Sequence, residues 1–256
     1  MHAESQLNPV PTDAPRGPIR VVVNPVLTGA LRAHLVEMWA RVTNEGGSVG
    51  FVAPVTPDDI RPTADRSFAR VVAGSDALVC LVAPVVPGAE RGQEGAVLAT
   101  TFDAHASAGI AADGEKIGQT AVPQSAENGH RRGRGTTAGY LPPVASSELA
   151  PGDQVVAWLL LAESESHLRR HWRTVYRVQV DPARQGAGLG TSLMAAAARY
   201  ARDSLGLAAL TLMTRSGTGA ERFYKRCGYR EVGRIPGAIR VRPGDDRDEV
   251  HFWIDL

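Results

Sequence analysis

Tyr176-Arg-Val-Gln-Val-Asp-Pro-Ala-Arg-Gln-Gly-Ala-Gly-Leu-Gly190 is the stretch of sequence that decides the fold. Its first half alternates like a strand, and its second half is a glycine turn that leads directly into a helix pattern. Gly186, Gly188 and Gly190 allow backbone NH groups to approach an anion, and the first turn of a helix adds unpaired NH donors and the positive end of its dipole. The segment therefore predicts a loop that binds a phosphate-bearing ligand.

The spacing of the glycines separates the common kinds of phosphate loop. A Walker loop ends in Gly-Lys-Ser or Gly-Lys-Thr, but Gly190 is followed by Thr191 and no lysine lies nearby. A dinucleotide-binding loop needs a third glycine where Thr191 stands, and it belongs to the first strand-helix unit of its fold rather than to a late one. The pattern that remains is Gln185-x-x-Gly188-x-Gly190, after a strand that ends Val180-Asp181-Pro182.

This pattern resembles the coenzyme A signature of the GNAT superfamily of N-acetyltransferases, (Gln/Arg)-x-x-Gly-x-(Gly/Ala). A second segment, Ala220 to Tyr229, resembles the Ala-x-x-(Phe/Leu)-Tyr-x-x-x-Gly-(Phe/Tyr) motif of the same superfamily and follows the first at the expected spacing. Short stretches at 46–51, 216–217 and 233–237 are similar to the tabtoxin-resistance acetyltransferase group. On these motifs the chain is identified as a member of the GNAT superfamily.

The resemblance implies a fold and an acetyl donor. The fold is mixed α/β (α+β): a central, mostly antiparallel twisted sheet with a V-shaped split, flanked by helices. The donor is acetyl-CoA, a co-substrate, with no metal required. Its pantetheine arm would pair with the backbone of Val178 and Val180, and Tyr224 would protonate the departing thiolate. The pyrophosphate would be held by Gln185, Gly186, Ala187, Gly188, Leu189, Gly190 and Thr191.

The acceptor side is less well defined by the sequence. In this superfamily the loop between the first two helices lies by the acceptor pocket, so the resemblance implies that Ser48 and Phe51 contact the acceptor; a simple tight turn is the alternative interpretation of that loop. Many relatives have an acidic residue at the position of Thr174, and the tabtoxin-resistance group has another at that of Met213. Neither Thr174 nor Met213 can act as a base.

The other titratable groups expected near the openings of the site are Glu163, Glu165, His171 and His251. Solvated or structural roles are the simpler interpretation of each. We therefore expect the acceptor amine to have a low pKa, as α-amino groups do at about 7.7 to 8.0, or to lose its proton to water.

Composition and the remaining sequence bound the other expectations. The chain has 256 residues, a net charge of +1, 43% hydrophobic residues and two cysteines, Cys80 and Cys227. These values favour an ordinary globular protein with free thiols, without a nucleic-acid or membrane partner. The N-terminus lacks the pattern of a signal peptide, so we expect a cytoplasmic protein; the sequence does not predict its oligomeric state.

The domain organisation follows from composition and periodicity. Residues 1–18 are proline-rich and predict a flexible tail, and residues 19–256 predict a single GNAT domain. A low-complexity insertion rich in Gly, Ala, Ser and Pro interrupts that domain at 85–151. Periodicity also predicts a helix that begins at Thr218 with Glu221 in a capping box, a break or kink near Pro62, and strands over 229–235 and 249–254 joined by a long turn.

The sequence as a whole predicts an acetyl-CoA-dependent N-acetyltransferase that acts on the amine of a small molecule, such as a toxin, antibiotic or amino-acid-like metabolite. Two alternatives remain open at this stage. One is acetylation of protein or peptide amines. The other, motivated by the missing carboxylates, is a catalytically silent module that binds acyl-CoA.

Overall fold

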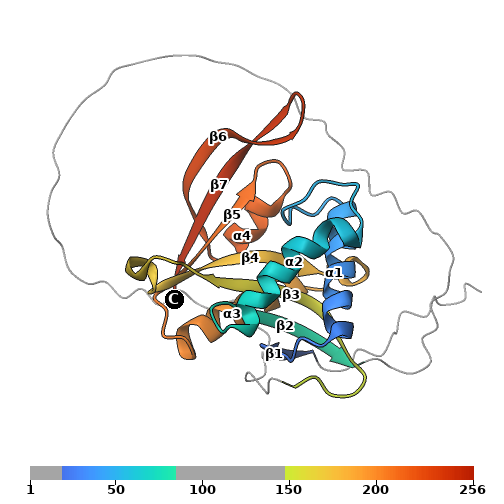
Figure 1. Cartoon of the computed structure of the whole chain (residues 1–256). Helices are drawn as coiled ribbons and strands as arrows, with labels where there is room; N and C mark the ends of the chain where they lie inside the picture. The colour runs from blue at the N-terminus through green and yellow to red at the C-terminus, as the bar shows by residue number, and fades with distance from the viewer. Residues whose placement is uncertain (1–18, 85–147) are drawn as a thin grey trace, which may run out of the picture. The chain divides into compact units, whose positions relative to one another are not determined.

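The computed structural model describes residues 19–84 and 148–256. The tail expected at 1–18 and nearly all of the insertion expected at 85–151 lie outside these ranges. Within them a seven-stranded sheet has the strand order β1-β2-β3-β4-β5-β7-β6 (Figure 1). The strands are β1 (Arg20–Val23), β2 (Ala77–Pro84), β3 (Asp153–Glu163), β4 (Trp172–Val180), β5 (Ala209–Arg215), β6 (Arg230–Arg242) and β7 (Asp245–Asp255).

The sheet is antiparallel except where β4 meets β5, and there it splits. The parallel pairing of these two strands covers only Trp172 to Thr174 against Ala209 to Thr211. Beyond Thr174 the two strands share no ladder, and both lie in the middle of the strand order. This confirms the mixed α/β fold and the V-shaped split, which leaves the backbone of β4 from residue 175 onward unpaired toward β5.

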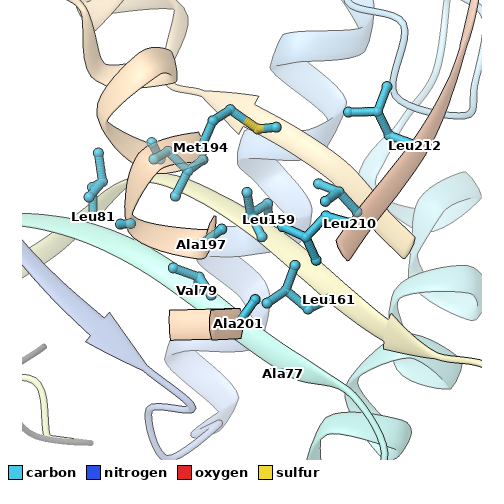
Figure 2. Close-up of a cluster of buried hydrophobic side chains, with 14 of the residues drawn as sticks. Ala77, Val79, Leu81, Leu159, Leu161, Met194, Ala197, Ala201, Leu210 and Leu212 are labelled. Atoms are coloured by element: carbon cyan, nitrogen blue, oxygen red, sulfur yellow. The ribbon is translucent and has the colours of Figure 1, made fainter. Parts of the chain in front are cut away.

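Helices cover the sheet on two faces. α1 (Gly29–Asn44) and α2 (Pro57–Val72) pack together and share one core with Leu78, Cys80 and Trp158 of the sheet. α3 (Leu189–Asp203) covers the other face, where its Met194, Ala197 and Ala201 gather with Leu159 and other strand residues (Figure 2). The small residues of α3 allow the helix to lie close to the sheet, so the glycine loop before it is fixed at the end of β4.

Three local expectations need correction. α4 (Ala220–Arg226) begins after Gly219, which adopts a left-handed conformation with φ of +77° and has no side chain to cap the helix. Thr218 Oγ1 accepts from the NH of Ala220, and Glu221 accepts from the NH of Gly217 and not from that of Thr218. The expected capping box at Thr218 is therefore wrong; the left-handed turn at Gly219 prevents the extended cap geometry that such a box requires. In contrast, α2 begins with a capping box, in which the side chains of Thr56 and Asp59 each accept a hydrogen bond from the backbone NH of the other.

α2 also continues through Pro62 as one helix. A proline costs one backbone hydrogen bond, here to the carbonyl of Asp58 in the exposed first turn, where water can replace it. The turn expected between the last two strands is likewise mostly strand: β6 and β7 form a long hairpin closed by Pro243 and Gly244. Irregularities in the pairing between Ile235 and Ile239 accommodate Pro236, which hides the strand pattern in the sequence.

Residue 177 is the second feature of β4 that positions the site. The β3–β4 ladder shifts register between Trp158 and Leu160, opposite Arg177, whose φ is +55°. A side chain in the left-handed region costs about 1 to 2 kcal/mol, so surrounding contacts must stabilise this bulge.

None of the helices in the described residues combines the length and apolar character needed to cross a membrane.

Candidate active site

The glycine loop has the geometry of an anion cradle. The backbone NH groups of residues 186–191 donate no hydrogen bond to any other described residue. Gly186 and Gly188 have φ of +79° and +78° with open space where a side chain would point, so these glycines are required by their backbone conformation and not by crowding. Six free donors at the start of α3, together with its dipole, fit the pyrophosphate of a nucleotide-containing ligand.

Gly190 has a different role from the other two glycines. A β-carbon at this position would lie 3.2 Å from the ring of Phe223 and 3.7 Å from Val180. The missing side chain thus allows the first turn of α3 to lie against both β4 and α4. This contact brings Tyr224, the neighbour of Phe223, close to the glycine loop.

A cavity of about 350 Å³ opens at the split between β4 and β5. Val178 of β4, Met213 of β5 and Tyr224 of α4 contribute to its wall. The loop after α1 and the β6–β7 hairpin complete the lining: Ser48, Val49, Gly50, Phe51, Val52, Val175, Tyr176, Arg177, Thr214, Arg215, Ile239, Arg240 and Glu249. The cavity therefore joins the expected thiol-protonating residue to the expected acceptor loop.

Tyr224 is half-buried and packs against Phe223, Tyr229 and Phe252. Burial raises the pKa of its phenol well above the ordinary value, with a smaller contribution from the neighbouring Cys227. A raised pKa keeps the O–H proton in place throughout the physiological range. The geometry thus suits a proton donor that faces the cavity.

The structure brings Ser48 and Phe51 to the cavity wall with Val178 and Tyr224. Val180 and the glycine loop lie outside the lining, at the end of β4 where α3 begins. The Gln185 side chain lies 3.5 Å from the carbonyl of Val180 and holds the loop against the end of the strand.

Arg177 is a functional candidate that the sequence did not reveal. Its guanidinium lies 4.7 Å from the ring centre of Trp39 and donates a 2.8 Å hydrogen bond to the carbonyl of Val49. Desolvation lowers the pKa of Arg177. Because the bulge turns this residue toward α1, its side chain links the loop that contains Val49 to the unpaired edge of β4.

The contact between Gly50 and Arg177 gives a first prediction. A β-carbon on Gly50, whose φ is +95°, would lie 1.7 Å from the Arg177 guanidinium. Gly50→Ala should displace Arg177 from Trp39 and raise the KM for the acceptor about tenfold or more, the equivalent of one lost hydrogen bond to a charged group. Gly46→Ala is the matched control, because Gly46 has φ of +90° with nothing within 4 Å. Equal KM values for the two variants would contradict this role of Arg177.

Of the four candidate bases that the sequence offered, three lie away from the cavity. Glu163 pairs with Arg173 at 3.4 Å, and Glu165 and His171 are exposed around the β3–β4 connection, outside the cavity lining. His251 is different, because it is the cross-strand partner of Met213, which lines the cavity. Glu249, two residues before it on β7, lines the cavity and was missed; the strand alternation of 249–254 could have placed it beside His251.

Comparison with known proteins agrees with this geometry. Residues 128–229 match the model of the Acetyltransferase (GNAT) family, a stretch that includes β3, β4, the glycine loop and α4. The described structure is similar over most of its length to solved members of that family. The chain has the GNAT acetyltransferase fold. No curated protein matches it, and membership of the tabtoxin-resistance group stays a prediction.

Three solved structures illustrate the similarity. An acetyltransferase of the GNAT family from Streptococcus pneumoniae is 11% identical, with 93% of this chain and 100% of that chain covered and a TM-score of 0.52. A protein from Salmonella typhimurium solved with its cofactor acetyl-CoA is 14% identical (92% and 94% covered, TM-score 0.51). A ribosomal-protein-alanine N-acetyltransferase from Brucella melitensis is 13% identical (92% and 99%, TM-score 0.51). At this identity the likeness defines the fold and leaves the acceptor open.

Proposed function

We propose that this protein transfers the acetyl group of acetyl-CoA to the amine of a small molecule. The observation that carries the proposal is the position of two features relative to β4, the strand at the split of the sheet. The NH groups of residues 186–191, which donate to no other residue in the described part of the chain, lie at its end, and Tyr224 faces a cavity beside its unpaired edge. Acetyl-CoA has the matching order of groups, from pyrophosphate through pantetheine amides to thioester.

Each part of the ligand has a partner in the chain. The NH groups at the start of α3 would bind the pyrophosphate, and the backbone of Val178 and Val180, unpaired toward β5, would bind the pantetheine amides. An NH group near Val178 would stabilise the charge that develops on the thioester oxygen, a contribution of about 3 to 4 kcal/mol. Tyr224 would then donate its proton to the thiolate.

The cavity favours a small acceptor over a protein. Its volume of about 350 Å³ lies within the range of about 300 to 1,000 Å³ typical of small-ligand sites. The loop at 48–52 and the β6–β7 hairpin both contribute walls to this cavity. The similarity to a ribosomal-protein-alanine N-acetyltransferase makes a protein amine the competing acceptor.

An acceptor screen with thiol detection tests the proposal. Several amino-acid-like amines and a peptide with an N-terminal alanine would each be incubated with acetyl-CoA and the protein. We expect release of thiol with at least one small amine and little with the peptide. Turnover confined to the peptide would favour the protein acceptor, and coenzyme binding without turnover on any amine would favour a silent binding module.

The pKa of Tyr224 gives a prediction for pH dependence. Because burial raises this pKa, the donor proton is present at every pH below the raised value and is lost only above it. We therefore expect kcat to show no descending alkaline limb below about pH 10, the ordinary pKa of a tyrosine. A descending limb near pH 8 or 9 that disappears in Tyr224→Phe would contradict this protonation state.

A further inference from the structure

Glu249 brings a carboxylate to the cavity that faces the unpaired part of β4. It lies on β7 opposite Arg215 of β5, and its strand neighbour on the same face, His251, lies opposite Met213. Met213, Arg215 and Glu249 all line the cavity together with Tyr224. Glu249 is the only carboxylate among the described residues of that lining. A protonated amine that enters the cavity would therefore be attracted to this side chain.

The imidazole of His251 lies next to the carboxylate of Glu249. Its Nε2 atom is 2.8 Å from Oε1 of Glu249, and this atom is buried from solvent. The angles of the contact are not those of an aligned hydrogen bond, and no other residue in the described part of the chain binds Nε2. The imidazole as a whole remains 31% exposed, so a proton that reaches Nε2 can leave to water from the other ring nitrogen.

The other charged groups around Glu249 do not prevent its contact with His251. Arg240 of β6 is held by Asp246 at 2.7 Å, and Arg177 of β4 is held by Trp39 and Val49. Arg215 faces Glu249 across the strands but forms no ion pair with it within the described residues. The remaining titratable neighbours, Tyr176 and Tyr224, are phenols. None of these groups takes the place of the imidazole as a proton acceptor.

A proton acceptor is needed because of the energetics of the amine. A lysine-like amine, with a pKa of about 10.4, is neutral only about once in 2,500 molecules at pH 7, which costs about 4.6 kcal/mol. A carboxyl group titrates near 4.3 and accepts this proton poorly by itself, whereas an imidazole titrates near 6.5 and is well matched to neutral pH. When a carboxylate contacts the amine and passes the proton to an imidazole, the carboxylate supplies the position and the imidazole supplies the basicity.

We propose that Glu249 accepts the proton of the acceptor amine and transfers it to Nε2 of His251. The inference rests on the proposed acetyl transfer. The ammonium form of the acceptor loses one N–H proton to a carboxylate oxygen of Glu249, which passes it to His251, so the imidazole becomes imidazolium. The lone pair of the neutral amine forms the new C–N bond as the C–S bond breaks, and the thiolate takes the proton of Tyr224. The nitrogen then releases its second proton through water to the tyrosinate, and the imidazolium returns its proton to water.

Two amines of similar size and different basicity test this role. At pH 7 n-propylamine is protonated and 2,2,2-trifluoroethylamine is neutral. We expect Glu249→Gln and His251→Gln each to lower kcat/KM for propylamine by about 10² to 10³, and to leave the value for trifluoroethylamine within about threefold. Asp255→Asn, an exposed carboxylate on the same strand, is the matched control and should change neither. Equal losses with both amines would overturn the proposal.

A second measurement does not depend on turnover. In a protein labelled with ¹⁵N-histidine, the Nε2 signal of His251 should change in Glu249→Gln, because Oε1 of Glu249 lies 2.8 Å from that atom. An unchanged signal would overturn the pairing. Absence of acetylation of both amines by the wild-type protein would count against the proposed function itself, and the Nε2 signal would still decide whether Glu249 and His251 act together.

Discussion

Tyr224→Phe is expected to lower kcat by about 10² to 10⁴ and to leave the Kd of acetyl-CoA within about twofold, the range over which a positioned acid contributes. The phenol lies on the cavity wall with Val178, and burial keeps it protonated. The ring itself packs among Phe223, Tyr229 and Phe252, contacts that phenylalanine preserves. Steady-state kinetics with the best acceptor, together with calorimetric titration of acetyl-CoA, would measure the two quantities.

Tyr229→Phe is the matched control for this prediction. Tyr229 is 3% exposed, its ring lies 6.2 Å from that of Tyr224, and burial raises its pKa as well. It does not line the cavity, so removal of its hydroxyl should leave kcat unchanged. A loss of kcat that is equal in the two variants, or a loss below threefold in Tyr224→Phe, would contradict the assignment of Tyr224 as the acid.

Gly188→Val is expected to raise the Kd of acetyl-CoA about 100-fold, because two hydrogen bonds to a charged pyrophosphate at about 1.5 kcal/mol each would be lost. Gly188 has φ of +78°, and a β-branched residue avoids this region, so the loop must rotate its NH groups away from the ligand. Calorimetric titration measures the affinity, and thermal unfolding reports the fold.

A substitution at a second glycine separates the effect of backbone strain from the effect on coenzyme binding. Gly152 has φ of +84° and equally open surroundings, but it lies in the turn before β3. Gly152→Val should therefore lower the free energy of unfolding by a similar amount, about 1 to 2 kcal/mol, without a change in Kd. Micromolar affinity retained in Gly188→Val, or a comparable loss in Gly152→Val, would refute the assignment of the loop.

Local patterns were enough to predict the geometry of the glycine loop, which is the proposed donor site. The strand into Val180, the positive-φ glycines at 186 and 188 and the start of α3 all lie within one continuous stretch, so their spacing in sequence is their spacing in space. Tyr224 belongs to a second local motif, Ala220 to Tyr229, and the contact of its neighbour Phe223 with Gly190 joins that motif to the start of α3. Short-range geometry and sequence pattern agree in these regions.

The acceptor side depends on contacts between distant segments, which no local pattern contains. Glu249 reaches the cavity only because β7 pairs with β5, and Arg177 meets Val49 only because the bulge in β4 turns its side chain toward α1. The hairpin was also underestimated, because Pro236 and Gly237 look like turn residues although irregular pairing retains them within β6. Long-range pairing therefore supplies the part of the site that the sequence did not reveal.

The structure of this protein with bound acetyl-CoA is the most direct measurement of the central claim. We expect the pyrophosphate to accept hydrogen bonds from NH groups of residues 186–191, the pantetheine arm to lie along β4 at Val178 and Val180, and the thioester to reach the cavity beside Tyr224. A complex in which the coenzyme lies away from the split between β4 and β5, with those NH groups bound to nothing but water, would contradict the account.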